Sequence, residues 1–200
     1  MKKLLLTILS AALFAKPVAA APYVSGSIGL ASLTNSDTTY RSVTSKNMIA
    51  YKSGIPCGAA IGVQSDAYRI EGALGYQSHD VDSVKRGGVP TAISGHTLSS
   101  LSYMINGYYD IDIKSYAPLS PYLTAGIGGA TITERGVNTS DESSSGFAWQ
   151  LGGGIGVKVS EHAIIDMGYR FFKPSAYNAN GATDITALSH NFLAGVRYNF

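Results

Sequence analysis

The fold is decided by the last stretch of the chain, Leu188-Ser-His-Asn-Phe-Leu-Ala-Gly-Val-Arg-Tyr-Asn-Phe200. Read in steps of two from its end, apolar side chains alternate with polar or small ones, and only Leu193 departs from the pattern. Successive strand residues point to opposite faces, so the segment has one apolar and one polar face. A tilted strand needs about ten residues to cross a bilayer, which this stretch supplies. A soluble half-buried strand would alternate in the same way, but it is usually about five or six residues long.

The amino terminus has the three parts of a secretory signal peptide. Met1-Lys2-Lys3 is a basic head, residues 4–15 are apolar, and small residues precede Ala21. The apolar run is too short for a transmembrane helix, and a buried helix is the alternative interpretation. We therefore predict a signal peptide at residues 1–20 and one exported domain at residues 21–200.

Charge and cysteine content narrow the class of protein further. The chain has 15 Lys and Arg against 13 Asp and Glu, but Lys2, Lys3 and Lys16 belong to the expected signal peptide. The exported domain is thus close to neutral, which excludes a nucleic-acid partner. The single cysteine, Cys57, cannot form a disulfide within the chain. We interpret it as a small apolar packing residue, with a reactive or intermolecular thiol as the alternative.

The same alternation recurs seven times before the final stretch. We predict strands at residues 23–31, 55–64, 68–79, 101–110, 121–131, 147–158, 163–172 and 188–200. Long connections (residues 32–54, 80–100, 132–146 and 173–187) alternate with shorter ones (65–67, 111–120 and 159–162). This arrangement is typical of a closed, all-β, eight-stranded antiparallel transmembrane barrel with short periplasmic turns and four longer extracellular loops. A periplasmic β-sandwich is the alternative, but it would need polar residues on the apolar faces.

Aromatic residues lie near the ends of the predicted strands, where the girdles of a membrane barrel would place them. The expected girdle residues are Tyr23, Tyr68, Tyr109, Phe147, Trp149, Phe171, Tyr198 and Phe200.

Four segments carry a resemblance to a known family. They are Tyr-Arg-Ile-Glu-Gly-Ala-Leu-Gly-Tyr at residues 68–76, Asn-Gly-Tyr-Tyr-Asp at 106–110, Pro-Tyr-Leu-Thr-Ala-Gly-Ile-Gly at 121–128 and Gly-Val-Arg-Tyr-Asn-Phe at 195–200. The chain resembles the small eight-stranded, porin-family outer-membrane barrels of the opacity and OmpA/OmpX type, over nearly all of the exported domain. The resemblance implies a bacterial cell outer membrane location. It is poorly specific for activity, because relatives are variously surface adhesins, membrane-stabilising proteins and narrow channels.

Charged residues fall on the inward face of the predicted barrel. They are Arg69, Glu71, Asp166, Arg170 and Arg197. Side chains just fill the interior of an eight-stranded barrel, and an unpaired charge there is costly. We therefore predict an interior ion-pair network that plugs the lumen, in which Glu71 has arginine partners. A narrow polar channel whose selectivity these charges set is the alternative.

Motifs for enzymatic chemistry are weak, and we predict no catalytic, cofactor or metal site. The four histidines are scattered without metal-ligand spacing. Ser78-His79 and Ser189-His190 could be taken for the groups of a lipid-modifying outer-membrane enzyme, but adjacent strand residues point to opposite faces. The glycines at 152–156 are not followed by the Lys-Ser/Thr of a phosphate loop.

The expected function therefore rests on the loops. We predict a surface protein, an adhesin or surface antigen, whose loops bind host-cell or matrix ligands; loops that only shield the barrel mouth are the alternative. Outer-membrane lipids and the barrel assembly machinery are the other expected partners of this monomer. The carboxyl-terminal assembly signal would comprise Phe192, Val196, Tyr198 and Phe200. Arginine at the lipid-facing Val196 should be costly, whereas serine at the inward Gly195 should be mild.

Overall fold

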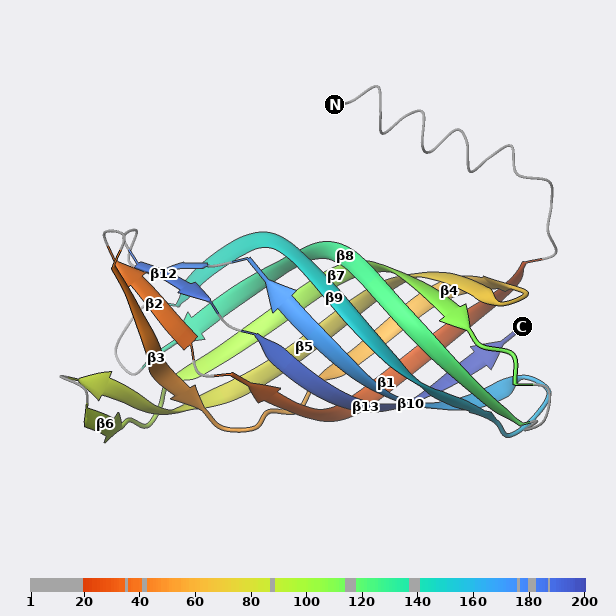
Figure 1. Cartoon of the computed structure of the whole chain (residues 1–200), viewed down its shortest axis with the longest axis horizontal. Coiled ribbons are helices and arrows are strands. Elements are labelled where there is room, and N and C mark those ends of the chain that lie inside the picture. The colour runs from red at the N-terminus through yellow and green to blue at the C-terminus, as the bar shows by residue number, and fades with distance from the viewer. Residues whose placement is uncertain are drawn as a thin grey trace, which may run out of the picture.

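The computed structural model describes residues 20–34, 36–40, 43–86, 89–113, 118–136, 141–175, 177–179, 183–186 and 188–200. The expected signal peptide lies outside these residues, except for Ala20. The described chain forms a β-barrel whose strands run obliquely around a long axis (Figure 1). In the described residues there is no helix that is long and apolar enough to span a membrane.

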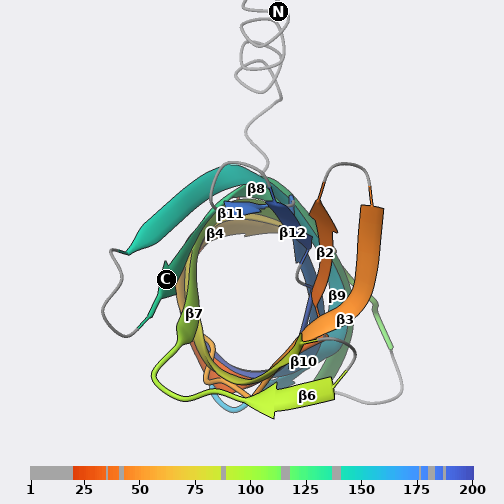
Figure 2. The same ribbon diagram turned by 90° about the vertical axis from the view of Figure 1, so that its left-hand side faces the viewer.

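Eight long strands form the closed wall, and each is antiparallel to its neighbours. They are β1 (Ala21–Leu33), β4 (Cys57–Ser65), β5 (Tyr68–Arg86), β7 (Thr97–Asp110), β8 (Leu119–Arg135), β9 (Glu142–Lys158), β10 (Ala163–Pro174) and β13 (Ser189–Asn199). The first strand pairs with the last, from Tyr23 opposite Asn199 to Leu33 opposite Ser189. This pairing closes the ring seen end-on in Figure 2. The eight-stranded barrel predicted from the sequence is thereby confirmed.

Alternating residues of each strand point outward and inward. The outward face is apolar: Leu74 remains 62% exposed and Phe192 62% exposed. The inward face holds the buried polar side chains, among them Arg69 at 3% and Arg197 at 2%. Only a closed sheet can expose apolar side chains to lipid without leaving backbone groups unpaired. The alternation in the sequence therefore maps directly onto the lipid-facing and lumen-facing surfaces.

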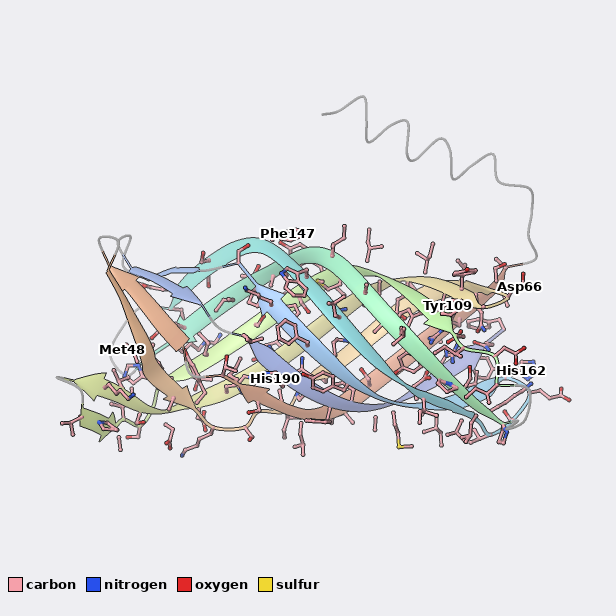
Figure 3. All side chains as sticks on the ribbon, in the orientation of Figure 1. Met48, Asp66, Tyr109, Phe147, His162 and His190 are labelled. Carbon is pink, nitrogen blue, oxygen red and sulfur yellow. The ribbon has the colours of Figure 1, made fainter. Side chains whose placement is uncertain are left out.

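The two ends of the barrel differ in the length of their connections. Asp66, with φ of 48°, lies in the two-residue turn between β4 and β5, and residues 159–162 join β9 to β10. Figure 3 places Asp66 and His162 at the same end of the barrel, opposite Met48. We assign the short-turn end to the periplasm and the other end to the cell exterior. The exposed apolar side chains of β5 run from Tyr68 to Tyr76 and the next positions of the same parity are Ser78 and Asp80, so we place the rest of β5 outside the bilayer.

The long extracellular connections contain more strand than the sequence analysis predicted. Beyond the expected ends, β5 continues to Arg86, β8 continues to Arg135, and β9 begins already at Glu142. Among the described residues of the connections there are five short strands: β2 (Ser36–Tyr40), β3 (Val43–Tyr51), β6 (Val89–Ala92), β11 (Tyr177–Ala179) and β12 (Thr183–Thr186). They gather at the left end of the barrel in Figure 1. The wall is therefore extended above the membrane.

One expected girdle residue is not on the outer surface. Tyr23 was predicted to face lipid, but it is 0% exposed and points into the lumen. Its neighbour Val24 takes the outward position, at 39% exposure. The tyrosine hydroxyl donates a hydrogen bond to Glu71 Oε2 at 2.9 Å, which stabilises the inward orientation.

Candidate functional site

The periplasmic half of the lumen is occupied by an ion pair between Arg69 and Asp110. Arg69 Nε donates to Asp110 Oδ2 at 2.9 Å and Arg69 Nη2 donates to Oδ1 at 2.8 Å. The guanidinium also lies over the rings of Tyr108 and Tyr122, at 4.2 and 5.0 Å from their centroids. Such forked contacts are the strongest of the charge-assisted hydrogen bonds. The barrel thus holds this cation in one fixed position.

A second ion pair joins the last strand to β10. Arg197 Nε donates to Asp166 Oδ2 at 3.2 Å, and Arg197 Nη1 donates to Gln64 Oε1 at 3.0 Å. Gln64 Nε2 in turn lies 3.5 Å from Asp110 Oδ2. Gln64 therefore connects the two ion pairs into one polar layer across the barrel.

Glu71 follows Arg69 by two residues on β5, which places it one inward position further from the periplasm. Its partners are not the arginines that the sequence predicted. Its Oε1 accepts hydrogen bonds from Asn106 Nδ2 at 2.9 Å and Tyr108 Oη at 2.7 Å, and its Oε2 accepts the bond from Tyr23. In the part of the chain that the structure describes, Glu71 has no arginine partner. Neutral donors, which the sequence pattern did not single out, stabilise this carboxylate.

Arg170 is the remaining member of the predicted network. Its Nη2 donates to Tyr108 Oη at 3.3 Å. The structure thus brings Arg69, Glu71 and Arg170 around Tyr108, and it brings Asp166 and Arg197 together beside them. Sequence reasoning did not assign Tyr108, Tyr23, Asn106 and Gln64 to this cluster, although the strict alternation already placed Asn106 and Tyr108 on the inward face.

Two groups of apolar side chains lie in the lumen on the extracellular side of the polar cluster. Met104, Ala130, Ala148 and Phe172 form one buried group. Above it, Leu98 and Ile132 pack together with the partly buried Leu33, Ile49 and Tyr51. We call these two groups the apolar cap. The sequence analysis did not predict the apolar cap, because it expected every inward position to be polar or small.

A buried histidine lies beside the apolar cap, in the extracellular extension of β5. His79 is 2% exposed, its Nδ1 is 3.1 Å from Lys52 O, and its Nε2 has no hydrogen-bond partner. Burial lowers the pKa of the imidazole below its ordinary value of 6.5. The ring occupies space that a side chain at Gly54 would need, since a Cβ there would lie 2.7 Å from it. His79 therefore ties the connection between β3 and β4 to the barrel wall.

Extracellular connections that are distant in sequence pair with each other. Strand β12 pairs with β2 and β3 pairs with β5, while β6 forms a local hairpin with the other side of β5. Thr34 binds Leu188 O through its backbone N at 2.9 Å and its hydroxyl at 3.2 Å. The first and last connections thus form one continuous sheet, because the strands that carry them are neighbours.

The residues of the expected assembly signal lie on the outer face of the last strand. Phe192, Val196, Tyr198 and Phe200 are 62, 55, 45 and 67% exposed, respectively. The Tyr198 and Phe200 rings contact each other with centroids 5.4 Å apart.

Ser189 and His190, the second of the two serine–histidine pairs, point to opposite faces of the barrel wall. Ser189 is fully buried and bonds to Gln77 and Asn191, whereas the His190 ring stacks among outer-face aromatic residues and bonds to Tyr169 Oη at 2.6 Å. Cys57 is exposed on the outer face. Among the described residues, no three His, Cys, Asp or Glu side chains lie close enough together to hold a metal ion.

Comparison with known proteins places the chain in a family. The family model of the outer membrane protein β-barrel domain matches residues 4–200. The chain belongs to this outer-membrane β-barrel family. Its location is therefore the bacterial outer membrane, as the sequence predicted.

Similar proteins include outer-membrane proteins of Salmonella and Brucella. Outer membrane protein PagN of Salmonella typhimurium is 31% identical over 125 residues, which cover 50% of this chain and 49% of PagN. The 25 kDa outer-membrane immunogenic protein of Brucella melitensis is 28% identical over 75% of this chain and 66% of its own length. The chain thus spans about half of PagN and just under two thirds of the Brucella protein.

Solved structures support the barrel fold. Neisserial surface protein A matches with a TM-score of 0.61 at 18% identity, covering 90% of this chain and 97% of the other. OprG of Pseudomonas aeruginosa matches with a TM-score of 0.57 at 15% identity, covering 90% and 97%.

Proposed function

We propose that this outer-membrane barrel is a non-enzymatic surface scaffold that presents its extracellular loops for recognition or adhesion. The observation that carries the proposal is the sheet that β12, β2, β3, β5 and β6 form above the membrane. Backbone pairing joins these strands into one sheet, which would support the loops that it carries. Binding residues are commonly placed on loops that a rigid scaffold supports.

The relatives support a surface role. The name of the Brucella relative describes that protein as immunogenic, which agrees with exposure at the cell surface. Neither the Brucella name nor the PagN name describes an enzymatic activity. The opposite orientations of Ser189 and His190 are a further reason to favour recognition over lipid modification.

The proposed scaffold has a closed lumen. Two observations support closure: the polar cluster around Tyr108 on the periplasmic side, and the apolar cap on the extracellular side. Side chains are expected to fill the interior of an eight-stranded barrel. The apolar cap would also oppose the entry of hydrated ions.

The adhesion proposal is tested by trimming loops without disturbing the apolar cap. Residues 36–46 and 84–91 are replaced separately by short Gly-Ser linkers, which leaves Ile49, Tyr51 and Leu98 in place. Bacteria carrying each variant are compared for attachment to epithelial cells and matrix-coated wells. Attachment should fall while heat-modifiable migration, the sign of a folded barrel, remains. Attachment that survives both deletions would reject recognition through these loops.

A narrow passive channel is the second candidate, because polar residues line the periplasmic half of the lumen. Conductance of the purified protein in planar bilayers distinguishes the two functions. The scaffold proposal expects silence from a protein shown to be folded. Discrete conductance steps that persist after loop trimming and change in Arg69→Gln would favour the channel.

The carboxyl-terminal strand carries a further part of the proposal. We propose that Phe192, Val196, Tyr198 and Phe200 form the signal that the barrel assembly machinery recognises and that the barrel acts as a monomer. Phe200→Ser should lower the amount of assembled barrel in cells, whereas refolding of the purified variant should be little changed. Equal assembly in cells would remove this role.

A further inference from the structure

The wall between β1 and β5 is closed in two different ways along its length. Strand β4 lies between these two strands and pairs with both. Towards the cell exterior, the same place in the wall is taken by residues 52–56, which belong to neither β3 nor β4 and which we call the strap. Gly54 of the strap exchanges two backbone hydrogen bonds of 2.8 Å with Ala31 of β1, and Lys52 N donates to Asp80 O of β5 at 2.9 Å. The strap therefore completes the wall above β4.

A side chain of β5 supplies a further contact to the strap. His79 is 2% exposed, and its Nδ1 lies 3.1 Å from Lys52 O. A carbonyl oxygen only accepts, so Nδ1 carries the proton and Nε2 is the acceptor of the neutral ring. The ring lies against the backbone of Gly54, where a Cβ would be 2.7 Å from its Nδ1 and Cε1. The strap thus covers the ring only because residue 54 is a glycine.

The surroundings of His79 suit a neutral ring. In the described structure, His79 Nε2 and Ser100 Oγ are both buried without a hydrogen-bond partner, and both residues line one cavity of about 20 Å³. This cavity has room for one water, which can bridge the two atoms. One water does not replace the hydration shell of a cation, and burial of a charge without a counter-charge is costly.

The charged groups on the neighbouring elements do not face this ring. Asp80 follows His79 on the opposite face of β5 and is exposed, as is the side chain of Lys52 in the strap. Lys173 of β10 and His190 of β13 belong to the outward rows of their strands. Strands β1, β7 and β8 contribute only uncharged side chains to the cavity. Among the described residues that line it, none is therefore a carboxylate that could pair with a charged ring.

Glu134 is a second titratable group at this end of the lumen. It follows Ile132 by two residues on β8 and shares its inward face. Burial raises the pKa of the Glu134 carboxyl, and His96 acts in the opposite direction. A carboxyl with a raised pKa favours the folded state as the pH falls, which is opposite in sign to a buried histidine. A loss of order in acid would therefore not arise from Glu134.

We propose that His79 makes the strap an acid-sensitive latch, in which uptake of one proton at Nε2 releases residues 52–56 from β1 and β5. At neutral pH the ring binds Lys52 O and the strap covers it. A charged ring needs contact with water, and lifting the strap provides that contact. The end of β3 loosens with the strap, so the extracellular sheet is held more firmly at neutral than at acidic pH. The latch does not rest on any ligand of the loops.

Hydrogen exchange of the strap amides tests the latch. The protein, extracted from outer membranes into detergent, is compared at about pH 7.5 and about pH 5.5, and each rate is corrected for the intrinsic exchange rate at that pH. The informative amides are those of Lys52 and Gly54, which donate to Asp80 O and Ala31 O. About one pH unit below the ordinary histidine pKa of 6.5, their protection should be about five- to tenfold lower than at neutral pH. Amides of residues 103–107 in β7 should keep their protection.

Two histidine variants identify the titrating group. His79→Gln removes the proton-binding ring, while its amide can still donate to Lys52 O, so the difference between the two pH values should disappear. The difference should remain in His162→Gln, because His162 lies at the opposite end of the barrel (Figure 3).

If His79→Gln fails to fold, an NMR titration of the unmutated protein decides. The His79 ring should take up its proton below about pH 6.5, together with the loss of strap protection. Equal protection at the two pH values, an unchanged loss in His79→Gln, or a ring that becomes charged while the strap stays protected would overturn the latch.

Discussion

Arg69 on β5 and Asp110 on β7 form a forked ion pair in the lumen, with side chains that are 3% and 10% exposed. The pair lies at the periplasmic end, where Asp110 N also bonds to Ala67 O in the turn at 2.7 Å. It therefore fixes the β4–β5 turn against the neighbouring strand. A buried pair contributes little net stability, but the loss of one partner leaves an uncompensated charge.

Asp110→Asn should destabilise the barrel by about 3–5 kcal/mol, because Arg69 would remain buried without its carboxylate. Asp141→Asn is the control: its ion pair with Arg135 has side chains that are 52% and 65% exposed. Exposed pairs contribute about 0–1 kcal/mol. Urea unfolding in lipid vesicles measures both variants, and similar losses would contradict the structural role assigned to the buried pair.

Glu71→Gln should lower the free energy of unfolding by about 2 kcal/mol, since hydrogen bonds to a charged acceptor contribute about 1.5–3 kcal/mol. An amide has one acceptor atom, so one of the donors from Tyr23, Asn106 and Tyr108 would lose its partner. Resistance to heat and detergent is the measurement. Glu161→Gln, in the exposed turn before β10, should behave like the unmutated protein. Unchanged resistance in both variants would reject the role of Glu71.

Val196→Arg should destabilise the barrel by about 2–4 kcal/mol if the position lies near the midplane of the bilayer. Val196 points outward and is 55% exposed, so the guanidinium would enter lipid. Val196→Leu, measured by the same vesicle assay, keeps the surface apolar and should be tolerated. Equal unfolding free energies for the two variants would contradict the outward orientation.

Acid should destabilise the extracellular end through His79. Burial lowers the pKa of this imidazole in the folded state, so the unfolded chain binds the proton first as pH falls below about 6.5. Stability is then complete above the unfolded pKa and declines towards the lower folded pKa. Gln77, Ser99, Ser100 and Ser189 face the same small cavity of about 20 Å³, and no carboxylate lines it to receive a second N–H.

The thermal midpoint should therefore fall between neutral and mildly acidic pH, and His79→Gln should reduce that fall. His162→Gln is the control, because His162 is exposed in a periplasmic turn and stacks on Tyr198. A pH dependence that survives unchanged in His79→Gln would exclude this histidine as its source.

The sequence analysis expected Gly195→Ser to have little effect on stability, and the structure contradicts the reason for that expectation. A Cβ at Gly195 would lie 2.6 Å from Gly26 O and 3.1 Å from Ser27 Cβ. Alternation indicated correctly that this residue faces the lumen, but it contains no information about how closely the neighbouring strand approaches. We now expect the serine variant to be destabilised by overpacking, measurable as a lower urea midpoint.

Period-two alternation was sufficient to predict the barrel, its strand number and the lipid-facing surface, because these depend on which residues share a face. The alternation could not predict which inward side chains are long enough to contact one another across the lumen. Tyr23 shares the inward parity of Ser25, so the alternation itself places it in the interior, but the contact of its hydroxyl with Glu71 depends on reach. Leu98 and Ile132 are inward although apolar, and they pack against Leu33, Ile49 and Tyr51. The pairing of β2 with β12 required knowledge of which connections are neighbours in space.

The closure of the wall by β1 and β13 has a consequence for how the protein is made. The first and last strands are the most distant segments of the barrel in sequence, so their pairing is the most non-local one. Non-local pairings form slowly, and until this one forms both strands carry an unpaired edge. Until β13 pairs with β1, an unfolded exported chain can therefore associate with other chains through these unpaired edges. Its survival before insertion depends on isolation from other chains as much as on the stability of the finished barrel.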